Sequence, residues 1–375
     1  MSKDAPTHMM FYLDNLKALL IIFVVLVHTA VTYSGIGSWF YKEPRPMGNI
    51  SYCFFFFFMF ITQAYFMSLF FMISAYFVPG SLEKKGMKKF IADRLYRLGL
   101  PALIFAFLIC PICITLAHPN ISLIDRYVQG ITTLSIFSWT GPLWFVVALL
   151  IFTLLYLVIK RPLDLFISKH EFDVNVKSVS ILVGLITFFA FVIRLFFPIG
   201  TSVMNMQFCF FSAYVFMFLV GIAAYQKDIF SKIDYRAGKK WLVAAFAVGI
   251  PLLAIIMRFG VSSTRSWSFI GGWNAMSLLY AFSESYLCVT IIIALVGIFK
   301  ARFNTQNSLQ KFLSDNAFGV YVFHTPVLIS ISVVLKNMVM SPFLKFVMVA
   351  CLAIPASFIV SHFVRKIPVL RKIFS

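Results

Sequence analysis

Three ionisable residues lie in the first long apolar stretch of the 375-residue sequence: Asp14, Lys17 and His28. Asp14 and Lys17 are three apart, a spacing that places both on one face of a helix. Lys17 and His28 are eleven apart, or three turns of about 3.67 residues, so they also share a face. Their separation along the axis is ~16 Å. An imidazole suits proton transfer with a hydroxyl. The structural alternative is a lysine reaching toward water and a histidine bonded to a neighbouring helix.

Two later apolar stretches also carry ionisable residues. Glu284 is the one acidic residue expected in the middle of such a stretch. It could orient a histidine, stay protonated as a donor, pair with a cation or make a packing hydrogen bond. His324 lies two residues before Pro326, which has no N–H and therefore frees a backbone carbonyl nearby. Catalytic and structural roles for His324 are equally compatible with the sequence. We take His28, Glu284 and Asp14 as candidate catalytic residues.

Arg94 and Arg97 are predicted to share a helix face just before Pro101. A guanidinium forms paired hydrogen bonds with phosphate oxygens, so two of them at a membrane boundary suit a phosphorylated substrate. The alternative is that they belong, with the neighbouring lysines of segment 84–89, to the general basic charge of one membrane side. The scattered histidines offer no metal-ligand spacing, and we expect no metal site.

The composition requires a membrane around these residues. The chain is 61% hydrophobic and only 12% charged, whereas a soluble domain averages about 25% charged residues. A span needs ~20 mostly apolar residues. The sequence predicts an all-α, polytopic membrane protein that forms one integral membrane domain over residues 1–375, with about ten transmembrane helices. They are expected at 13–34, 52–78, 97–117, 141–159, 178–197, 205–225, 241–258, 272–299, 316–335 and 342–364.

The basic residues indicate an orientation. Most of the 32 Lys and Arg lie in alternate connections and in the tail after the last span, whereas few, such as Arg45, Arg126 and Arg194, lie in the others. By the positive-inside rule, both termini are expected in the cytoplasm. The net charge of +19 then reflects topology and attraction to the lipid bilayer. Nucleic-acid binding is not expected, since no soluble basic face is available.

Five motifs, in order, resemble the acyltransferase-3 family of integral membrane acyltransferases. Residues 12–17 followed by His28 resemble its opening signature, with Lys17 at a position where Arg is usual. Residues 70–77 resemble its F-F-x-x-S-G-Y-F segment, with Ser74 matched and Ala75 at the usual Gly. Further resemblances are the R-x-x-R…P motif in residues 94–101, Trp144 at the start of the fourth helix, and an I-Y-x-x-H element with Tyr321 and His324. The ending 367–370 is similar to periplasmic-glucan succinyl transferases.

This resemblance implies transfer of an acyl group, acetyl or succinyl, from cytoplasmic acyl-CoA to a hydroxyl of an extracytoplasmic carbohydrate or glycan. The group transferred is not an aminoacyl group, acyl-CoA is a co-substrate, and no permanently bound cofactor is expected. The protein would be a multi-pass protein of the plasma (inner) membrane. Lys17, Arg94 and Arg97 would contact the donor's phosphates, and His28 would act as general base or carry the acyl group briefly. The expected substrate or tunnel residues are Asn15, Ser74, Trp144, Tyr321 and His324.

Two other functions are compatible with the same residues. Buried Lys, His and Glu also suit ion coupling in a transporter or flippase of a carbohydrate-like substrate. A paired set of broken helices, typical of such transporters, is not obvious in the sequence. A structural or assembly subunit would tolerate simultaneous replacement of Lys17, His28 and Glu284. Formation of a product that depends on an acyl donor distinguishes the enzyme from both.

Overall fold

The computed structural model describes residues 10–262 and 266–374. The chain is 81% helical, and its described residues contain no strand. Ten helical segments of the described chain are long and apolar enough to cross a membrane. They are Phe11–Ser34, Asn49–Lys85, Met87–Ala117, Gly141–Lys169, Val176–Phe196, Phe208–Lys227, Tyr235–Gly260, Ala275–Arg302, Ser308–Val334 and Pro342–Lys366. The prediction of ten membrane helices is confirmed.

Each predicted range coincides with one of these segments, and the differences lie at the ends. The fourth helix, for example, continues from the predicted end at 159 to Lys169. The reason is that apolar patterning stops at the first charged residues, whereas the backbone hydrogen bonds of a helix continue past them. Helices therefore extend beyond the stretch that lipid covers.

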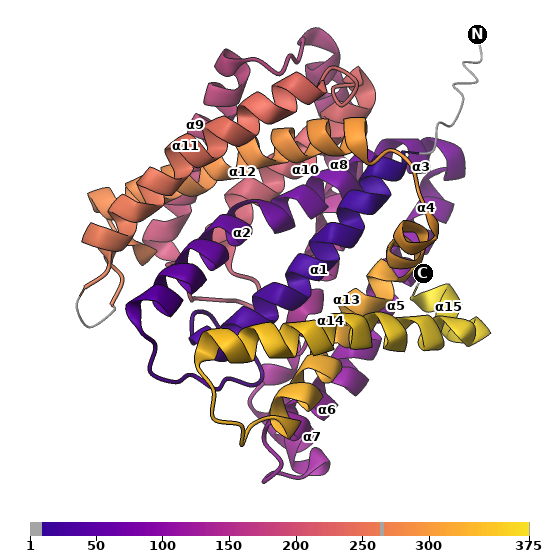
Figure 1. Cartoon of the computed structure of the whole chain (residues 1–375). Helices are drawn as coiled ribbons and strands as arrows, with labels where there is room; N and C mark the ends of the chain where they lie inside the picture. Colours follow the sequence, from indigo (N-terminus) through magenta and orange to yellow (C-terminus); the bar gives the residue numbers. More distant parts are fainter. Residues whose placement is uncertain (1–9, 263–265, 375) are drawn as a thin grey trace.

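The helices shown in Figure 1 follow one another along the chain. Their bounds are α1 Phe11–Ser34, α2 Asn49–Tyr76, α3 Val78–Lys85, α4 Met87–Arg94, α5 Leu100–Ile104, α6 Cys110–Ala117, α7 Leu123–Thr132, α8 Trp144–Lys169, α9 Val176–Phe196, α10 Phe211–Lys227, α11 Tyr235–Gly260, α12 Ala275–Arg302, α13 Ser308–Val334, α14 Pro342–Lys366 and α15 Pro368–Ile373.

The third crossing is not a regular α-helix. It contains two π-helical turns, Leu95–Gly99 and Phe105–Ile109, and each ends two residues before a proline, Pro101 or Pro111. Proline lacks the N–H of the helical ladder, so the hydrogen bonding must shift around it. Such π turns are frequent at functional sites. Arg97 lies in the first of them.

The centre of the bundle is formed by α1, α2 and α12. About 72% of the apolar window of α2 and of α12 is buried, against 22% for α11. A helix enclosed on all sides is buried by its neighbours, whereas one with few buried residues faces lipid. In Figure 1, α1 and α2 run between a group containing α9, α11 and α12 and a group containing α13 and α14. His28 of α1 is therefore half-buried among neighbouring helices, whereas Asp14 and Lys17 near the start of α1 stay partly exposed.

The two ends of the bundle differ in charge. Five crossings end in a basic residue on one side, at Lys85, Lys169, Lys227, Arg302 and Lys366. We call this end the basic face. The connection 35–48 between α1 and α2 lies at the other end, which we call the opposite face, together with the start of α8. His28 is in the part of α1 near the opposite face, and Asp14 and Lys17 are near the basic face.

Candidate active site

Three rings from three parts of the chain stack near the opposite face. His28 of α1 lies face to face with Trp39 of connection 35–48, with 3.8 Å between ring centroids and 18° between planes. The His324 ring of α13 lies beside this pair, with its centroid 5.2 Å from that of His28 and 6.0 Å from that of Trp39, and its plane is within 20° of both. We call Trp39, His28 and His324 the ring stack. The structure thus brings together the two histidines that the sequence marks as site candidates, and it adds Trp39, which was not predicted.

The ring stack presents nitrogens that have no partner within the described chain. His28 Nδ1, His324 Nε2 and Trp39 Nε1 are all enclosed without a hydrogen bond. Most buried polar atoms in proteins are hydrogen-bonded, so three such atoms in one cluster indicate groups that can serve a substrate. The His28 side chain is itself half-buried. Since Nδ1 is enclosed, Nε2 is the nitrogen of His28 that keeps access to the surrounding space.

The orientation of His324 is fixed by its own helix. Its Nδ1 lies 2.8 Å from the carbonyl of Tyr321 and 3.2 Å from that of Val320. A carbonyl only accepts, so Nδ1 carries the proton and donates. In the neutral ring the enclosed Nε2 is then an acceptor that points away from the backbone of α13. Its neighbour Thr325 also has an enclosed hydroxyl oxygen without a partner among the described residues.

Tyr321 joins the ring stack to the turn that begins the fourth crossing. Its hydroxyl donates to the carbonyl of Pro142, and its ring centroid is 6.3 Å from that of His324. The preceding Gly141 has φ +49°, and an added Cβ would lie 2.6 Å from the Phe105 ring, so a larger residue would force this turn to move. Trp144, two residues later than Pro142, stacks instead on Tyr214 of α10 at 5.7 Å.

The connection that carries Trp39 is tied down by an ion pair. Lys345 of α14 is 1% exposed, and its Nζ lies 2.5 Å from Oε1 of Glu43. Glu43 also accepts from Arg45 at 2.7 Å, and its backbone N–H donates to Thr32 of α1 at 2.8 Å. These contacts fix connection 35–48 across α1 and α14, which holds Trp39 over His28.

Glu284 lies in a different cluster. It pairs with Arg194 of α9, and both side chains are almost fully enclosed, at 0% exposure for Arg194 and 6% for Glu284. The guanidinium also lies 4.9 Å from the ring centroid of Tyr280. Of the sequence alternatives, pairing with a cation is the one observed. Assigning Arg194 to a connection was wrong, because its long side chain turns inward to Glu284. The sequence contained a sign of this buried position, since Arg194 lies inside the predicted span 178–197.

The predicted residues near the basic face form separate contacts. Asp14 and Lys17 pair at 2.7 Å, and Lys17 Nζ lies 5.5 Å from the ring centroid of Phe77. The side-chain amide of Asn15 donates to the carbonyls of Phe303 and Thr305, at 2.8 and 2.9 Å, and so attaches α1 to the connection between α12 and α13. Asp14 thus meets a lysine and not a histidine. Ser74 is half-buried at the basic end of α2.

Arg94 and Arg97 do not act as one pair. Arg94 is half-buried against the ring of Phe90, 5.0 Å from its centroid, and its Nε is enclosed without a partner in the described chain. Arg97 is 58% exposed and donates through Nε to Asp93 at 3.1 Å. Arg94 is the last residue of α4, whereas Arg97 lies within the π-helical turn that starts at Leu95, so regular α-helical spacing does not hold between them. Helical spacing alone could not reveal this difference.

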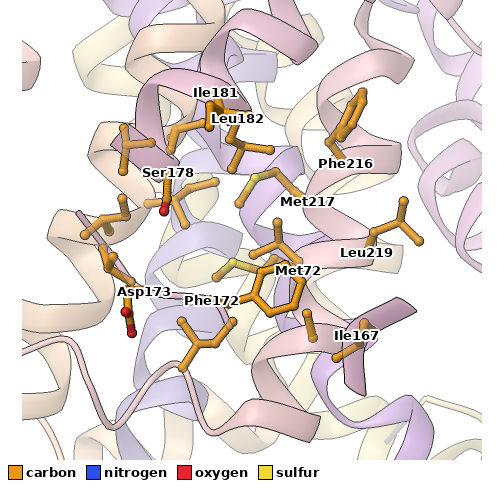
Figure 2. Close-up of a pocket in the computed structure, with 18 of the residues that line it drawn as sticks. Met72, Ile167, Phe172, Asp173, Ser178, Ile181, Leu182, Phe216, Met217 and Leu219 are labelled. Atoms are coloured by element: carbon orange, nitrogen blue, oxygen red, sulfur yellow. The ribbon is translucent and has the colours of Figure 1, made fainter. Parts of the chain in front are cut away.

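A large apolar cavity of about 540 Å³ lies between α8, α9, α10 and α12. In Figure 2, Met72, Phe172 and Met217 point into it, and Asp173 lies at its edge. None of the predicted site residues lines this cavity. Its hydrocarbon lining offers no polar group for chemistry apart from those at the edge, so the ring stack remains the candidate active site.

Residues 10–362 match the family model described as an acyltransferase domain, which covers nearly the whole chain. Comparison with curated proteins and with solved structures finds no match. The family match agrees with the resemblance of the five motifs, although it does not distinguish between branches of the family. The chain therefore belongs to the acyltransferase-3 family and is a multi-pass membrane protein that transfers acyl groups.

Proposed function

We propose that this protein moves an acetyl or succinyl group from cytoplasmic acyl-CoA to a hydroxyl of an extracytoplasmic carbohydrate or glycan. The observation that carries this proposal is the ring stack, in which a half-buried histidine lies face to face with Trp39 and beside His324, and three enclosed ring nitrogens have no partner in the described chain. A protein that only needed histidines for packing would satisfy their nitrogens. Acyl transfer needs such a group free to exchange a proton.

In the proposed reaction, Nε2 of His28 takes the proton of the acceptor hydroxyl while the hydroxyl oxygen attacks the thioester carbonyl. The carbon–sulfur bond then breaks, and the proton passes from His28 to the leaving thiolate to give free CoA. In the second version, Nε2 of His28 attacks the thioester carbonyl, and the carbon–sulfur bond breaks to release the CoA thiolate. The acceptor hydroxyl then attacks the acyl group on Nε2 and frees the histidine, and the hydroxyl proton ends on the CoA thiol. In both versions, stacking on Trp39 holds the His28 ring so that one nitrogen faces the reactants.

The direction of transfer follows from charge. The basic face carries the terminal Lys and Arg of five crossings, and the positive-inside rule places such a face in the cytoplasm. With that orientation, in the plasma membrane, Lys17, Arg94 and Arg97 lie on the donor's side, and His28 lies nearer the acceptor's side. The acyl arm would follow α1 for the ~16 Å between Lys17 and His28.

The other predicted residues have supporting parts in this proposal. Tyr321 donates to the carbonyl of Pro142, and Trp144 follows this turn by two residues, so we assign both to the acceptor's side of the site. Asn15 and Ser74 lie on the donor's side, and Asp14 balances Lys17. Glu284 is assigned to charge balance with Arg194, because the geometry gives it no contact with a histidine.

The experiment that tests the function uses purified protein in detergent. We expect acetyl-CoA or succinyl-CoA to raise the thermal midpoint saturably, since a ligand that binds the folded state stabilises it. Released CoA thiol is then measured with the preferred donor and a panel of hydroxyl-bearing glycans. The variant His28→Ala should release no CoA above background, whereas His362→Ala, which removes an imidazole at the far end of α14, should behave as wild type.

Two outcomes would contradict the proposal. Acyl transfer by a folded His28→Ala protein would exclude the mechanism. Movement of a glycan across vesicle membranes without any CoA release would favour the transporter.

A further inference from the structure

A second cavity opens beside the third crossing at the basic face. Its volume is about 760 Å³, and it lies between the end of α4 with the following π turn and the end of α14 with α15. The residues that line it are Asp93, Tyr96, Arg97, Lys366, Pro368, Arg371 and Lys372. Segments more than 260 residues apart in the sequence therefore meet here.

The lining carries a large excess of positive charge. Four cations, Arg97, Lys366, Arg371 and Lys372, face one carboxylate. That carboxylate, Asp93, is already engaged by Lys85 at 2.8 Å and by Arg97 at 3.1 Å. Neither Arg371 nor Lys372 has an ion-pair partner among the described residues. Like charges gathered around a cavity repel one another, so a bound anion would stabilise this arrangement.

The cations from the tail are held in place. Pro368 lies in the first turn of α15, and Ile373 and Phe374 at its end are buried. The ring of Phe374 packs against Phe323 of α13 with 5.1 Å between centroids. Because α15 follows directly on α14 and its end is buried, Arg371 and Lys372 are held at the cavity. The cations therefore belong to an ordered helix that packs on the bundle.

We infer that this cavity binds the phosphates of the acyl donor's nucleotide, with Arg371 and Lys372 as phosphate ligands in addition to Arg97. The inference rests on the proposed function and names the part of the donor that binds. Guanidinium and ammonium groups bind phosphates by charge-assisted hydrogen bonds. Tyr96, 45% exposed among these cations, offers an aromatic face on which an adenine base can stack. An anionic lipid headgroup shares the phosphate chemistry but has no base to stack.

The test measures binding of adenosine 3′,5′-bisphosphate, which is the nucleotide part of CoA without the thioester arm. Thermal midpoints of the full-length protein are followed against ligand concentration in a detergent free of anionic lipid. We expect saturable stabilisation of the wild type and at least tenfold weaker binding by Arg371→Gln/Lys372→Gln. The matched control Lys169→Gln/Lys177→Gln removes two charges from the same face between α8 and α9 and should bind within twofold of wild type. The charge-conserving Arg371→Lys/Lys372→Arg should restore most of the binding.

Two further measurements separate the outcomes. Tyr96→Leu should weaken binding of the nucleotide but leave any stabilisation by phosphatidylglycerol vesicles unchanged. If phosphatidylglycerol stabilises the wild type and the nucleotide does not, the cavity is a lipid site and the inference is wrong. Unchanged nucleotide affinity in the folded Arg371→Gln/Lys372→Gln protein would also overturn it.

Measuring the release of CoA thiol distinguishes failure of this inference from failure of the proposed function. The Arg371→Gln/Lys372→Gln protein should show a raised KM for the donor with kcat near wild type. If its KM for the donor equals that of the wild type and the wild type turns over, the site assignment fails while the function stands. If the wild type releases no CoA, the function itself fails.

Discussion

Two polar clusters lie inside this membrane bundle, and they differ in how their polar groups are compensated. Arg194 and Glu284 join α9 to α12 and neutralise each other. The ring stack joins α1, α13 and connection 35–48, and it leaves three nitrogens without a partner in the described chain. Both clusters contain residues that are costly in a membrane. Nε and Nη1 of Arg194 are also enclosed without a partner in the described chain, so unpartnered nitrogens alone do not distinguish the clusters. The charges of the Arg194 cluster cancel and both side chains are almost fully enclosed, which serves structure. His28 in the ring stack is only half-buried, so it is available to a substrate. The comparison predicts opposite responses to mutation.

The largest expected effect is on activity at the ring stack. His28→Ala should lower kcat/KM for acyl transfer by 10²–10⁴-fold, the usual range for removal of a general acid–base group. Its thermal midpoint should change little, because the imidazole makes no hydrogen bond that the fold depends on. Released CoA and differential scanning fluorimetry on the same sample provide the two readouts. A large loss of stability with retained specific activity would reverse the roles of the two clusters.

The Arg194–Glu284 pair should respond in the opposite way. Arg194→Met leaves an unpaired carboxylate in the bundle and should destabilise the protein by about 3–5 kcal/mol. Removing both charges in Arg194→Met/Glu284→Gln should recover much of that stability, since no isolated charge remains. Denaturant titration in mild detergent measures the free energy of unfolding of both variants. Turnover per folded molecule should stay near wild type in the double variant, and its complete loss there would place Glu284 in the chemistry.

Lys345 offers a third, smaller test of the comparison, because its ion pair supports the ring stack. Lys345→Met should destabilise by about 1–3 kcal/mol, the cost of leaving a buried polar group without a partner. The loss is smaller than for Arg194→Met because Glu43 keeps Arg45 at 2.7 Å. Lys345→Arg should restore stability. If limited proteolysis cuts connection 35–48 no faster in Lys345→Met than in wild type, the ion pair does not hold that connection.

Trp39→Leu should have the smallest effect. Stacked ring pairs contribute about 0.5–1.5 kcal/mol, so we expect up to a tenfold fall in kcat/KM from a less well held His28. Trp39→Phe keeps a stacking face and should lose less. The two variants are compared by initial rates of CoA release. Equal activity in Trp39→Leu and wild type would show that His324 alone is enough to orient His28.

The sequence predicts the helices well because membrane burial leaves a strong apolar signal in each span. It also marks His28 and His324, since ionisable residues are rare in such stretches. It does not predict that these two rings stack, because the contact depends on how α1 packs against α13. Trp39 has no signal of this kind, as it lies in a connection where an aromatic residue is ordinary. The split between Arg94 and Arg97 arises from a π turn that regular helical spacing cannot reveal.

The face-to-face contact between Trp39 and His28 also gives the protein an optical property. An excited indole loses energy without emission when an imidazole lies against it, and more so when that imidazole is protonated. The chain has six tryptophans. Because its ring centroid lies 3.8 Å from that of His28, Trp39 should emit more weakly than a tryptophan without a stacked imidazole. The difference in fluorescence between wild type and Trp39→Phe then isolates its signal. An increase of that signal on mixing with a donor would report movement of the His28 ring away from Trp39, before any product has formed.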